Sequence, residues 1–534
     1  MKKFLYWIIP LSIGIALRLY PAFLGGLPFS TDAWPPIRNT ELLLRHTPIS
    51  LNDKVFDGYD NYWPANSLFG AVFSEVTDIN PLQAMSVGIP LTAALAIPIF
   101  YVLTNKIISR HEVAFVASIL LAAAYPHALF TAGVTKETYA NPLYMAAILL
   151  FLSMGKGRNI LLFTIISLTL VLTHHLTAAV TIAILAAMTF SDIINRVRNG
   201  FAIDKFAFMP LVVLATVAIA YNGLYAHQGL KLDLALSDWL SIFSHQIILF
   251  ALTLYLSSKP YITSNIRTIL SCATSTAVPL LVIFLCTKRP IVFNAPKLPT
   301  HYILYAAPFI LTPLPMLLGT GKLRQIHGGK SNAPFFWFAA VIGLLSYAIF
   351  VSDMGIGLAY RTLNFLLPPM AIICAAGIYR IHTLNVKFHI RKAAKRAAII
   401  TLIAIVGLNI YDLYASVFLQ ERYMGYFWLY RPEEFEAAAW TAKAAINQTA
   451  TGDMKISYLL KGYFNSDFNE AFGLKYLSGQ HSDPPEIMLI YGQMQKNGYV
   501  LYEGCSIDLP ENWTGKLRIL NLIYSNSYTK IYNG

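Results

Sequence analysis

Long apolar runs, separated by short polar segments, dominate the chain from its start to about residue 418. Runs of about 20 apolar residues are long enough to cross a hydrocarbon core of about 30 Å. Because backbone polar groups in lipid must be satisfied within their own segment, each run is expected to be a helix. The pattern predicts thirteen membrane spans, near residues 4–22, 83–104, 112–130, 139–154, 159–174, 176–190, 206–226, 239–257, 268–287, 301–319, 334–352, 362–379 and 398–418.

The connection after the first span, about residues 23–82, is too long for a simple loop and is expected to carry structure. The pair Pro35-Pro36 suits a helix start, and the residues after it place apolar side chains on one helical face. A second amphipathic helix is predicted near 65–77. Both helices are expected to lie in the membrane interface.

The last part of the chain, residues 419–534, has no long apolar runs and is predicted to be a small α/β domain. Its first segment, from Pro432, reads as a helix with acidic residues in its first turn. Short strand-like runs follow, at Lys455–Leu460, Ile487–Tyr491 and Tyr499–Glu503, with a hairpin formed by Leu520–Tyr524 and Tyr528–Tyr532. The predicted fold is therefore a polytopic α-helical membrane protein, with a transmembrane bundle over 1–418 and an α/β domain over 419–534.

Composition and charge agree with this class and orient the chain. Hydrophobic residues make up 56% and charged residues 13%, against about 25% charged in soluble domains. Lys and Arg concentrate in alternate loops, most densely in 380–396, which places the N-terminus in the cytoplasm and 419–534 outside the cell membrane. The net charge of +13 is explained by this bias, so no nucleic-acid partner is implied. No cleavage site follows the first span, which is expected to be retained, and the four Cys show no CxxC spacing.

Ionisable residues at membrane depth are expensive and are usually functional. Several of them fall at the outer ends of the predicted spans, where they could line one cavity. These are Asp32 in the first outer loop, Lys136 and Glu137 in the segment AGVTKETYANPL, His174 and His175, Lys288 and Arg289, and Arg361.

Each of these residues also has a simpler structural explanation, which the sequence leaves open. The explanations are helix capping or pairing with Arg38 for Asp32, pairing with Lys136 for Glu137, an interfacial aromatic role for His174 and His175, and a long side chain reaching toward water for Lys288, Arg289 and Arg361.

The order of these features resembles the GT-C superfamily of membrane glycosyltransferases, which use sugars carried on polyprenyl phosphate. Thirteen spans with an outer C-terminal domain are similar to the oligosaccharyltransferase catalytic subunit. Asp32 matches that family's first-loop acid, and Glu137 matches the last position of its second acidic motif. The FLLPP segment after Arg361, and Glu433-Glu434 before Trp440, also resemble archaeal or bacterial members.

The chain departs from the oligosaccharyltransferase pattern in two places. It contains no Trp-Trp-Asp string, and Thr135 stands where the second motif has its first acid, followed by Lys136. Whether a divalent metal (Mg²⁺ or Mn²⁺) is bound is therefore left open, with Asp32 and Glu137 as its candidate ligands.

The resemblance implies an inverting glycosyltransferase that moves a sugar from a polyprenyl (dolichyl-type) phosphate to a hydroxyl of a glycan, protein or lipid acceptor. Asp32 would be the catalytic base, and Lys136, Glu137, His174, His175, Arg289 and Arg361 would bind substrate. A lipid-linked donor agrees with the lack of a nucleotide-binding GxGxxG or Walker motif. The alternatives are a transporter or flippase of lipid-linked sugars, an oligosaccharyltransferase-like protein, and a scaffold without catalysis.

Overall fold

The computed structural model describes residues 2–46, 58–154, 159–203, 205–229, 235–258, 265–289, 297–325, 329–350, 355–383, 388–502 and 505–534. Residues 47–57, part of the predicted first outer loop, lie outside this set, as does Glu503 at the end of a predicted strand.

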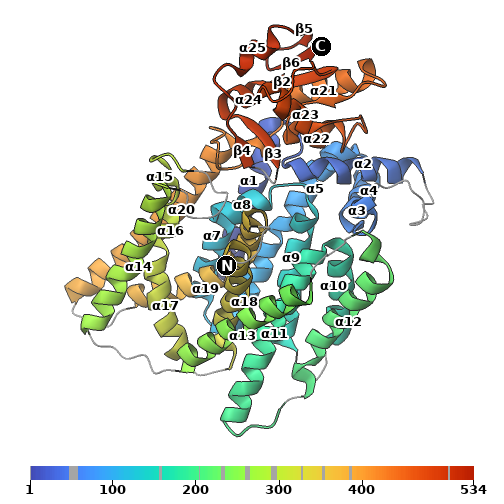
Figure 1. Ribbon diagram of the computed structural model, residues 1–534. Coiled ribbons are helices and arrows are strands. Elements are labelled where there is room, and N and C mark those ends of the chain that lie inside the picture. The colour runs from blue at the N-terminus through green and yellow to red at the C-terminus, as the bar shows by residue number, and fades with distance from the viewer. Residues whose placement is uncertain are drawn as a thin grey trace. The chain divides into compact units, whose positions relative to one another are not determined.

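Helices make up most of the described chain (Figure 1). The α-helices are α1 (Lys2–Gly25), α2 (Trp34–Arg45), α3 (Gly58–Asn61), α4 (Ala65–Thr77), α5 (Pro81–Ala94), α6 (Ala96–Ile108), α7 (His111–Ala123), α8 (Tyr125–Phe130), α9 (Lys136–Ser153), α10 (Ile160–Thr173), α11 (His175–Arg198), α12 (Met209–Leu224), α13 (Leu236–Ser258), α14 (Asn265–Cys286), α15 (Tyr302–Tyr305), α16 (Ala307–Leu311), α17 (Pro313–Gln325), α18 (Ala333–Phe350), α19 (Gly355–His382), α20 (Phe388–Val417), α21 (Pro432–Ala444), α22 (Met454–Leu460), α23 (Glu470–Leu477), α24 (Gly492–Asn497) and α25 (Trp513–Leu517).

Short 3-10 helices and strands complete the described secondary structure. They are η1 (Thr31–Ala33), η2 (Lys205–Ala207), η3 (Ala226–Gln228), η4 (Gly329–Asn332) and η5 (Tyr426–Trp428), with β1 (Ala450–Thr451), β2 (Ile487–Tyr491), β3 (Tyr499–Tyr502), β4 (Cys505–Ile507), β5 (Asn521–Ser525) and β6 (Thr529–Asn533).

Seven helical segments among the described residues are long and apolar enough to cross a membrane. They are Phe4–Gly25, Pro81–Ile108, His175–Arg198, Leu236–Ser257, Ala333–Phe350, Tyr360–His382 and Arg391–Val417. Shorter apolar helices occur at His111–Ala123, Ile160–Thr173, Met209–Leu224 and Ala273–Cys286. The protein is therefore a multi-pass membrane protein, while the predicted count of thirteen spans is not confirmed.

Some predicted spans are interrupted in the structure. The prediction of one helix over 301–319 is wrong, because that stretch is divided among α15, α16 and α17. Pro308 and Pro313, at the starts of α16 and α17, lack the N–H group that would continue the preceding helix. The predicted span 112–130 is likewise divided into α7 and α8, just before Pro126.

The described residues form two compact units. Unit 1 comprises Met1–Leu17, Thr92–Phe130 and Ala140–Leu413, and unit 2 comprises Arg18–Leu91, Thr131–Tyr139 and Tyr414–Gly534. Four of the five boundaries fall within helices α1, α5, α9 and α20, and the fifth falls at the end of α8.

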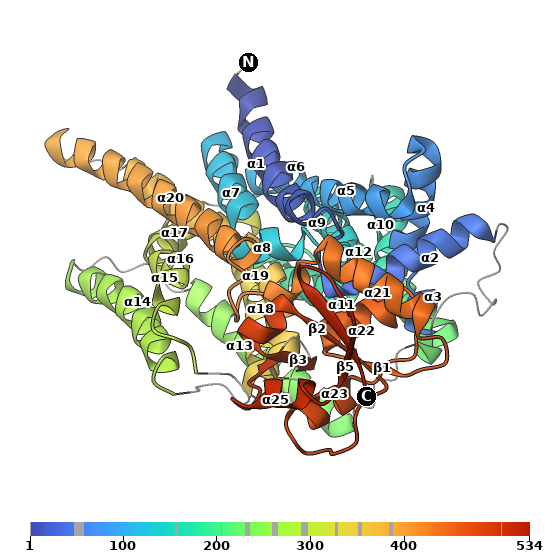
Figure 2. The same cartoon turned by 90° about the horizontal axis from the view of Figure 1, so that it is seen from above.

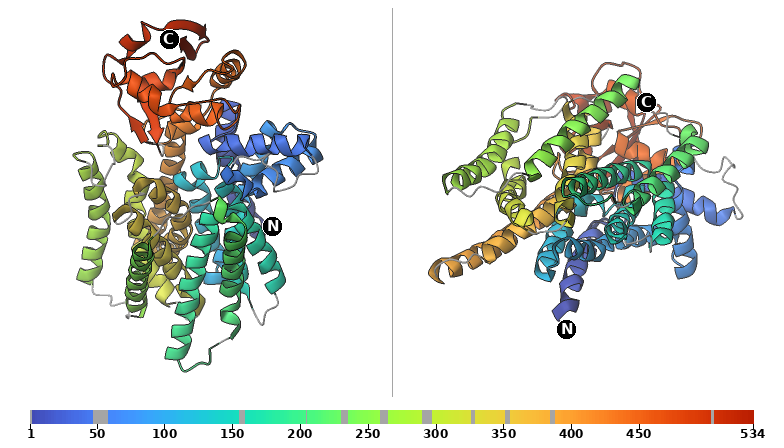
Figure 3. Two further views of the ribbon diagram at one scale, coloured as in Figure 1. Left: turned by 45° about the vertical axis from the view of Figure 1, so that its right-hand side comes forward. Right: turned by 90° about the horizontal axis from the view of Figure 1, so that it is seen from below.

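Unit 1 is a helix bundle with one large apolar core. Small residues let α17 and α19 approach closely: a Cβ on Gly319 would lie 1.8 Å from the carbonyl oxygen of Ile373, and one on Gly377 would lie 1.8 Å from that of Pro315. The indole of Trp337 in α18 donates a hydrogen bond of 3.1 Å to the carbonyl of Phe365 in α19. Contacts also join α10 to α12 and α13 to α18, and the further views in Figure 3 show the helices of this unit from the side and from below.

Unit 2 contains the strands. Its main sheet has the order β1-β2-β6-β5, with β1 parallel to β2 and the other pairs antiparallel, while β3 and β4 form a separate pair. Helices α21 and α22 contact each other, and Figure 2 shows them beside these strands. The predicted helix at Pro432, the strand Ile487–Tyr491 and the terminal hairpin are confirmed.

The predicted strand at Lys455–Leu460 is wrong, because these residues belong to helix α22. Asp453 precedes this helix, and its side chain accepts the Ile456 N–H at 3.2 Å. This N-cap satisfies one of the free donors of the first helical turn and so favours a helix here. In the first loop, α2 begins next to the proline pair, and α4 has the bounds predicted for the second amphipathic helix.

Candidate active site

Asp32 lies in η1, in a turn that other parts of unit 2 hold in place. Its backbone N–H donates to Oγ of Ser30 at 3.3 Å, and Ser30 N–H donates to the carbonyl of Trp428 at 2.9 Å. Ser30 has φ 87° and ψ 141°, a backbone conformation that is nearly restricted to glycine. The following helix, α2, has Ala33 at its N-cap position, with no side-chain cap hydrogen bond there.

An aromatic cluster fixes the start of α2 next to Asp32. Trp34 is completely buried, and its ring centroid lies 5.0 Å from that of Tyr430, 5.7 Å from Phe435 and 5.5 Å from Tyr463. Tyr463 also donates from its hydroxyl to Oε1 of Glu41, further along α2, at 2.7 Å. The ring contacts anchor the start of the helix that follows Asp32, and the hydrogen bond to Glu41 anchors its middle.

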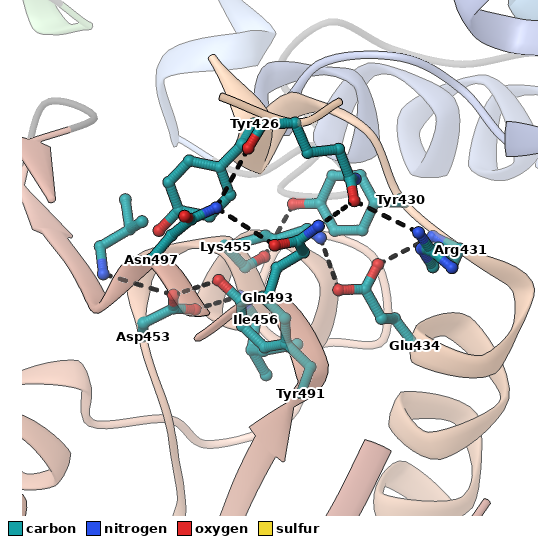
Figure 4. Close-up of polar contacts among 12 residues, drawn as sticks. Tyr426, Tyr430, Arg431, Glu434, Asp453, Lys455, Ile456, Tyr491, Gln493 and Asn497 are labelled. Atoms are coloured by element: carbon teal, nitrogen blue, oxygen red, sulfur yellow. Dashed lines mark hydrogen bonds and ion pairs between the residues drawn. The ribbon is translucent and has the colours of Figure 1, made fainter. Parts of the chain in front are cut away.

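A buried polar network shares Tyr430 with this cluster (Figure 4). The Tyr430 hydroxyl donates to the carbonyl of Lys455 at 2.7 Å, and the Lys455 ammonium lies 2.5 Å from Oε1 of Glu434. Neither charged side chain is exposed. Glu434 also accepts the N–H of Arg431 at 2.8 Å, so the buried pair is tied to the start of α21. These groups brace the Trp34 cluster, and we assign them no chemistry.

The segment that carries Lys136 and Glu137 runs beside the Asp32 turn. The N–H of Val134 donates to the carbonyl of Phe29 at 3.1 Å, which pairs the two segments close to both charged positions. Thr135 accepts the Thr138 N–H at 3.0 Å through Oγ1. The residue that stands in place of an acid therefore serves as a cap for α9. Glu137 is half-buried in the first turn of this helix.

Lys136 is nearly buried, with 7% of its surface exposed, and it pairs with a carboxylate that the sequence did not single out. Its Nζ lies 2.5 Å from Oδ1 of Asp60 in α3. The same nitrogen lies 4.0 Å from the ring centroid of Tyr59 and 5.7 Å from that of Trp63. The signal for Asp60 was present in the sequence, since it is an acid among aromatic residues within the same predicted outer loop as Asp32.

Burial is the largest influence on Lys136 and lowers the pKa of its ammonium, while the carboxylates of Asp60 and Asp32 raise it. The residues Asp32, Asp60 and Lys136 are called the Asp32 centre below. The structure thus brings together two predicted site residues, Asp32 and Lys136, and adds Asp60.

The predicted histidines lie in unit 1, at the start of α11. His174 is the N-cap of this helix: its Nδ1 accepts the Thr177 N–H at 3.4 Å and lies 2.7 Å from the Thr177 hydroxyl. His175 follows it, with ring centroids 5.2 Å apart. One ring nitrogen of His174, Nδ1, therefore caps the start of α11.

The predicted arginines also lie in unit 1. Arg361 in α19 donates from Nε to the Tyr360 hydroxyl at 3.3 Å, and the Tyr360 ring stacks on Phe130 at 5.3 Å. Arg289 is exposed and follows α14, next to Lys288, whose ammonium lies 5.2 Å from the Phe284 ring centroid. The Lys288 contact is that of a long side chain lying along its own helix end.

The described residues do not offer a ligand set for a divalent metal. No group of three or more His, Cys, Asp or Glu side chains that could hold a metal ion occurs among them. Mg²⁺ is held in octahedral geometry by oxygen ligands, including one or two carboxylates. At the Asp32 centre, Lys136 lies against one of the two acids, so the residues present do not fit such an ion.

Comparisons with known proteins show the fold. No family model and no curated protein matches the sequence. By structure, 93% of the chain matches 70% of the archaeal oligosaccharyltransferase AglB from Archaeoglobus fulgidus, solved with an inhibitory peptide and a dolichol-phosphate, at a TM-score of 0.54 and 12% identity. ArnT from Cupriavidus metallidurans, solved with undecaprenyl phosphate, matches over 98% of this chain and 97% of its own, at a TM-score of 0.51 and 8% identity. The chain therefore has the fold of GT-C glycosyltransferases, as its resemblance to this superfamily predicted.

Proposed function

We propose that the protein is an inverting glycosyltransferase that moves a sugar from a polyprenyl (dolichyl-type) phosphate to a hydroxyl acceptor at the outer membrane face. The acceptor is a glycan, a protein side chain or a lipid. In this proposal the N-terminus is cytoplasmic, the bundle spans residues 1–418, and residues 419–534 form the extracytoplasmic domain.

One observation carries the proposal: the chain matches two GT-C glycosyltransferases over almost its whole length, and each was solved with a polyprenyl-type phosphate. A donor of this kind reaches its enzyme through the bilayer, which agrees with the apolar helices found here. The chain lacks the Trp-Trp-Asp string, so we favour transfer of a single sugar over transfer of an oligosaccharide.

The reaction is a single displacement. The acceptor hydroxyl oxygen forms a bond to the anomeric carbon while the bond from that carbon to the phosphate oxygen breaks. The phosphate leaves with the bonding electron pair, and Asp32 accepts the hydroxyl proton. A carboxylate can do this within hydrogen-bond reach of the hydroxyl. The strained turn and the aromatic cluster fix the backbone on both sides of Asp32, which supports this role.

The leaving phosphate needs positive charge more than it needs a proton. Arg361 is proposed to bind it, because a guanidinium meets phosphate oxygens through two parallel hydrogen bonds. Arg289 and Lys136 add positive charge, and Glu137, His174 and His175 are proposed to bind sugar or acceptor hydroxyls. For His174 this contact would use Nε2, since Nδ1 caps α11.

The test is donor consumption by the purified full-length protein in lipid, followed by mass spectrometry with a panel of short-chain polyprenyl-phosphate sugars. Asp32→Asn is compared with wild type, and we expect loss of at least about 100-fold in rate, the usual contribution of a general base. Asp78→Asn is the matched control, because Asp78 is an exposed acid of the same unit in a left-handed conformation that Asn tolerates.

Equal consumption by wild type and Asp32→Asn would rule out Asp32 as the base. No consumption of any donor by the wild type, together with movement of lipid-linked sugars across sealed vesicles, would favour the transporter instead.

A further inference from the structure

The ammonium of Lys136 lies against one carboxylate and two aromatic rings. The carboxylate of Asp60 approaches it to 2.5 Å, and the face of Tyr59 covers it at 4.0 Å from the ring centroid. Tyr59 in turn packs on the buried Trp63, with centroids 4.9 Å apart. An ammonium held by one carboxylate and two aromatic faces has lost most of the freedom of an ordinary lysine.

This cation is also coupled to Asp32. Charge on Asp32 stabilises the ammonium of Lys136, as charge on Asp60 does. The pairing of Val134 with Phe29 at 3.1 Å holds the two segments together near these side chains. Asp32 and Asp60 therefore both act on the ammonium of the first residue of α9.

A divalent ion at the same place would require a different set of ligands. The chain has Thr135 where the resemblance leads one to expect an acid, and the Thr135 oxygen already accepts a hydrogen bond at the start of α9. The next position is occupied by the lysine. In the described part of the chain no group of three ligating side chains was found.

We propose that Lys136 is a built-in cation that takes the place of a divalent ion beside Asp32, and that Asp60 is the positioning residue that holds it there. The inference rests on the proposed function for its consequence: the ammonium offsets the negative charge of Asp32 and Asp60, so transfer proceeds without added metal. Lys136 also keeps its proposed place in the positive charge around the leaving phosphate.

A first measurement tests the cation without any transfer reaction. Wild type and Asp32→Asn in lipid are titrated with Mn²⁺, and bound ion is followed by electron paramagnetic resonance. We expect the two titrations to coincide, with no Mn²⁺ site that depends on Asp32. A site present in wild type and lost in Asp32→Asn would overturn the proposal, whether or not a donor has been found.

A second measurement uses the rate of donor consumption, with EDTA present. We expect EDTA to change the wild-type rate by less than about two-fold. Lys136→Gln should slow consumption by at least about 10-fold, because it removes a fixed positive charge from the site. Lys136→Arg should recover most of that rate, because it keeps the charge, and Lys443→Gln is the matched control at an exposed lysine of the same unit.

An unchanged rate in Lys136→Gln, or a wild-type rate abolished by EDTA and restored by Mn²⁺, would overturn the proposal. If Lys136→Gln fails to fold, the double variant Asp60→Asn/Lys136→Gln removes both partners of the ion pair and leaves no buried charge alone. The same loss of rate is expected in that variant, and an unchanged rate would again overturn the proposal. Failure of the wild type to consume any donor would count against the proposed function, while the Mn²⁺ titration would still decide the cation.

Discussion

The buried acid Asp453 should make the stability of unit 2 depend on pH. Its side chain is completely buried at the start of α22, where it accepts the Ile456 N–H at 3.2 Å, the Val500 N–H at 3.3 Å and the Tyr491 hydroxyl at 2.5 Å. These contacts and the Lys455 ammonium lower its pKa, but desolvation is the larger effect and raises the pKa from 3.8 to about 6.

The sign of the effect follows from proton binding. Between pH 3.8 and about 6 the folded protein keeps the Asp453 proton, while the unfolded chain has lost it. The unfolded state therefore binds fewer protons, and the free energy of unfolding falls as the pH rises through this window. A shift of about two pKa units corresponds to about 3 kcal/mol, present in full below pH 3.8 and lost above about pH 6.

The assay compares wild type with Asp453→Asn, which cannot ionise. Thermal unfolding of both proteins in lipid is followed by tryptophan fluorescence from about pH 4 to about pH 8. Groups common to both proteins cancel in the difference of their midpoints. We expect the wild type to lose about 6–12 °C relative to the variant over this range, because 1 kcal/mol shifts the midpoint of a unit of this size by about 2–4 °C.

Glu511→Gln is the control, since Glu511 is an exposed acid of the same unit. A difference between wild type and Asp453→Asn that is constant with pH would refute the reasoning. A wild type that gains stability relative to Asp453→Asn as the pH rises would show that its hydrogen bonds outweigh desolvation.

Substitutions at Arg361, Glu434 and Ser30 test the phosphate site, the buried ion pair and the strained turn. Arg361→Lys should slow donor consumption by at least about 10-fold at unchanged midpoint temperature, because a lysine cannot form the two parallel bonds to phosphate; an unchanged rate would remove Arg361 from the phosphate site. Glu434→Gln should lower the free energy of unfolding by about 3–5 kcal/mol, because it leaves the Lys455 ammonium buried without its partner. Glu434→Gln/Lys455→Met should recover most of that loss, and a double variant as unstable as the single one would contradict this. Ser30→Gly should relieve the backbone strain and raise the free energy of unfolding by about 1 kcal/mol. It should also slow donor consumption, because the turn that carries Asp32 becomes less fixed; a rise in both the free energy of unfolding and the rate of consumption would contradict this.

Local patterns allowed the sequence to predict several elements of unit 2. The helices α2 and α4 follow from a proline pair and from apolar residues at helical spacing. The terminal hairpin follows from two β-rich runs around Asn526-Ser527. The strand expected at Lys455–Leu460 failed because one side-chain contact, from Asp453, decides for a helix where the run of residues alone is ambiguous.

The candidate site was predictable only in part, for a physical reason. Asp32 and Lys136 could be found because an ionisable residue near an apolar span is unusual wherever it occurs. Their partner Asp60 could not be assigned, because its meeting with Lys136 joins two segments that are distant along the chain. The role of His174 as a helix cap depended on where α10 ends, which periodicity locates only to within a few residues.

Two features of unit 2 that cost stability lie next to Asp32, the residue that the resemblance also singles out. Ser30 adopts a backbone conformation suited to glycine, and Lys136 is a nearly buried lysine; each costs stability that a neutral sequence would avoid. Both features adjoin Asp32, one through a backbone hydrogen bond and the other through its charge. Natural sequences keep such conflicts mainly where function requires them. The Glu434–Lys455 pair is also buried, but its place within the domain core gives it a structural explanation. Two conflicts adjoin Asp32, and its surroundings are therefore the first place at which catalysis should be sought.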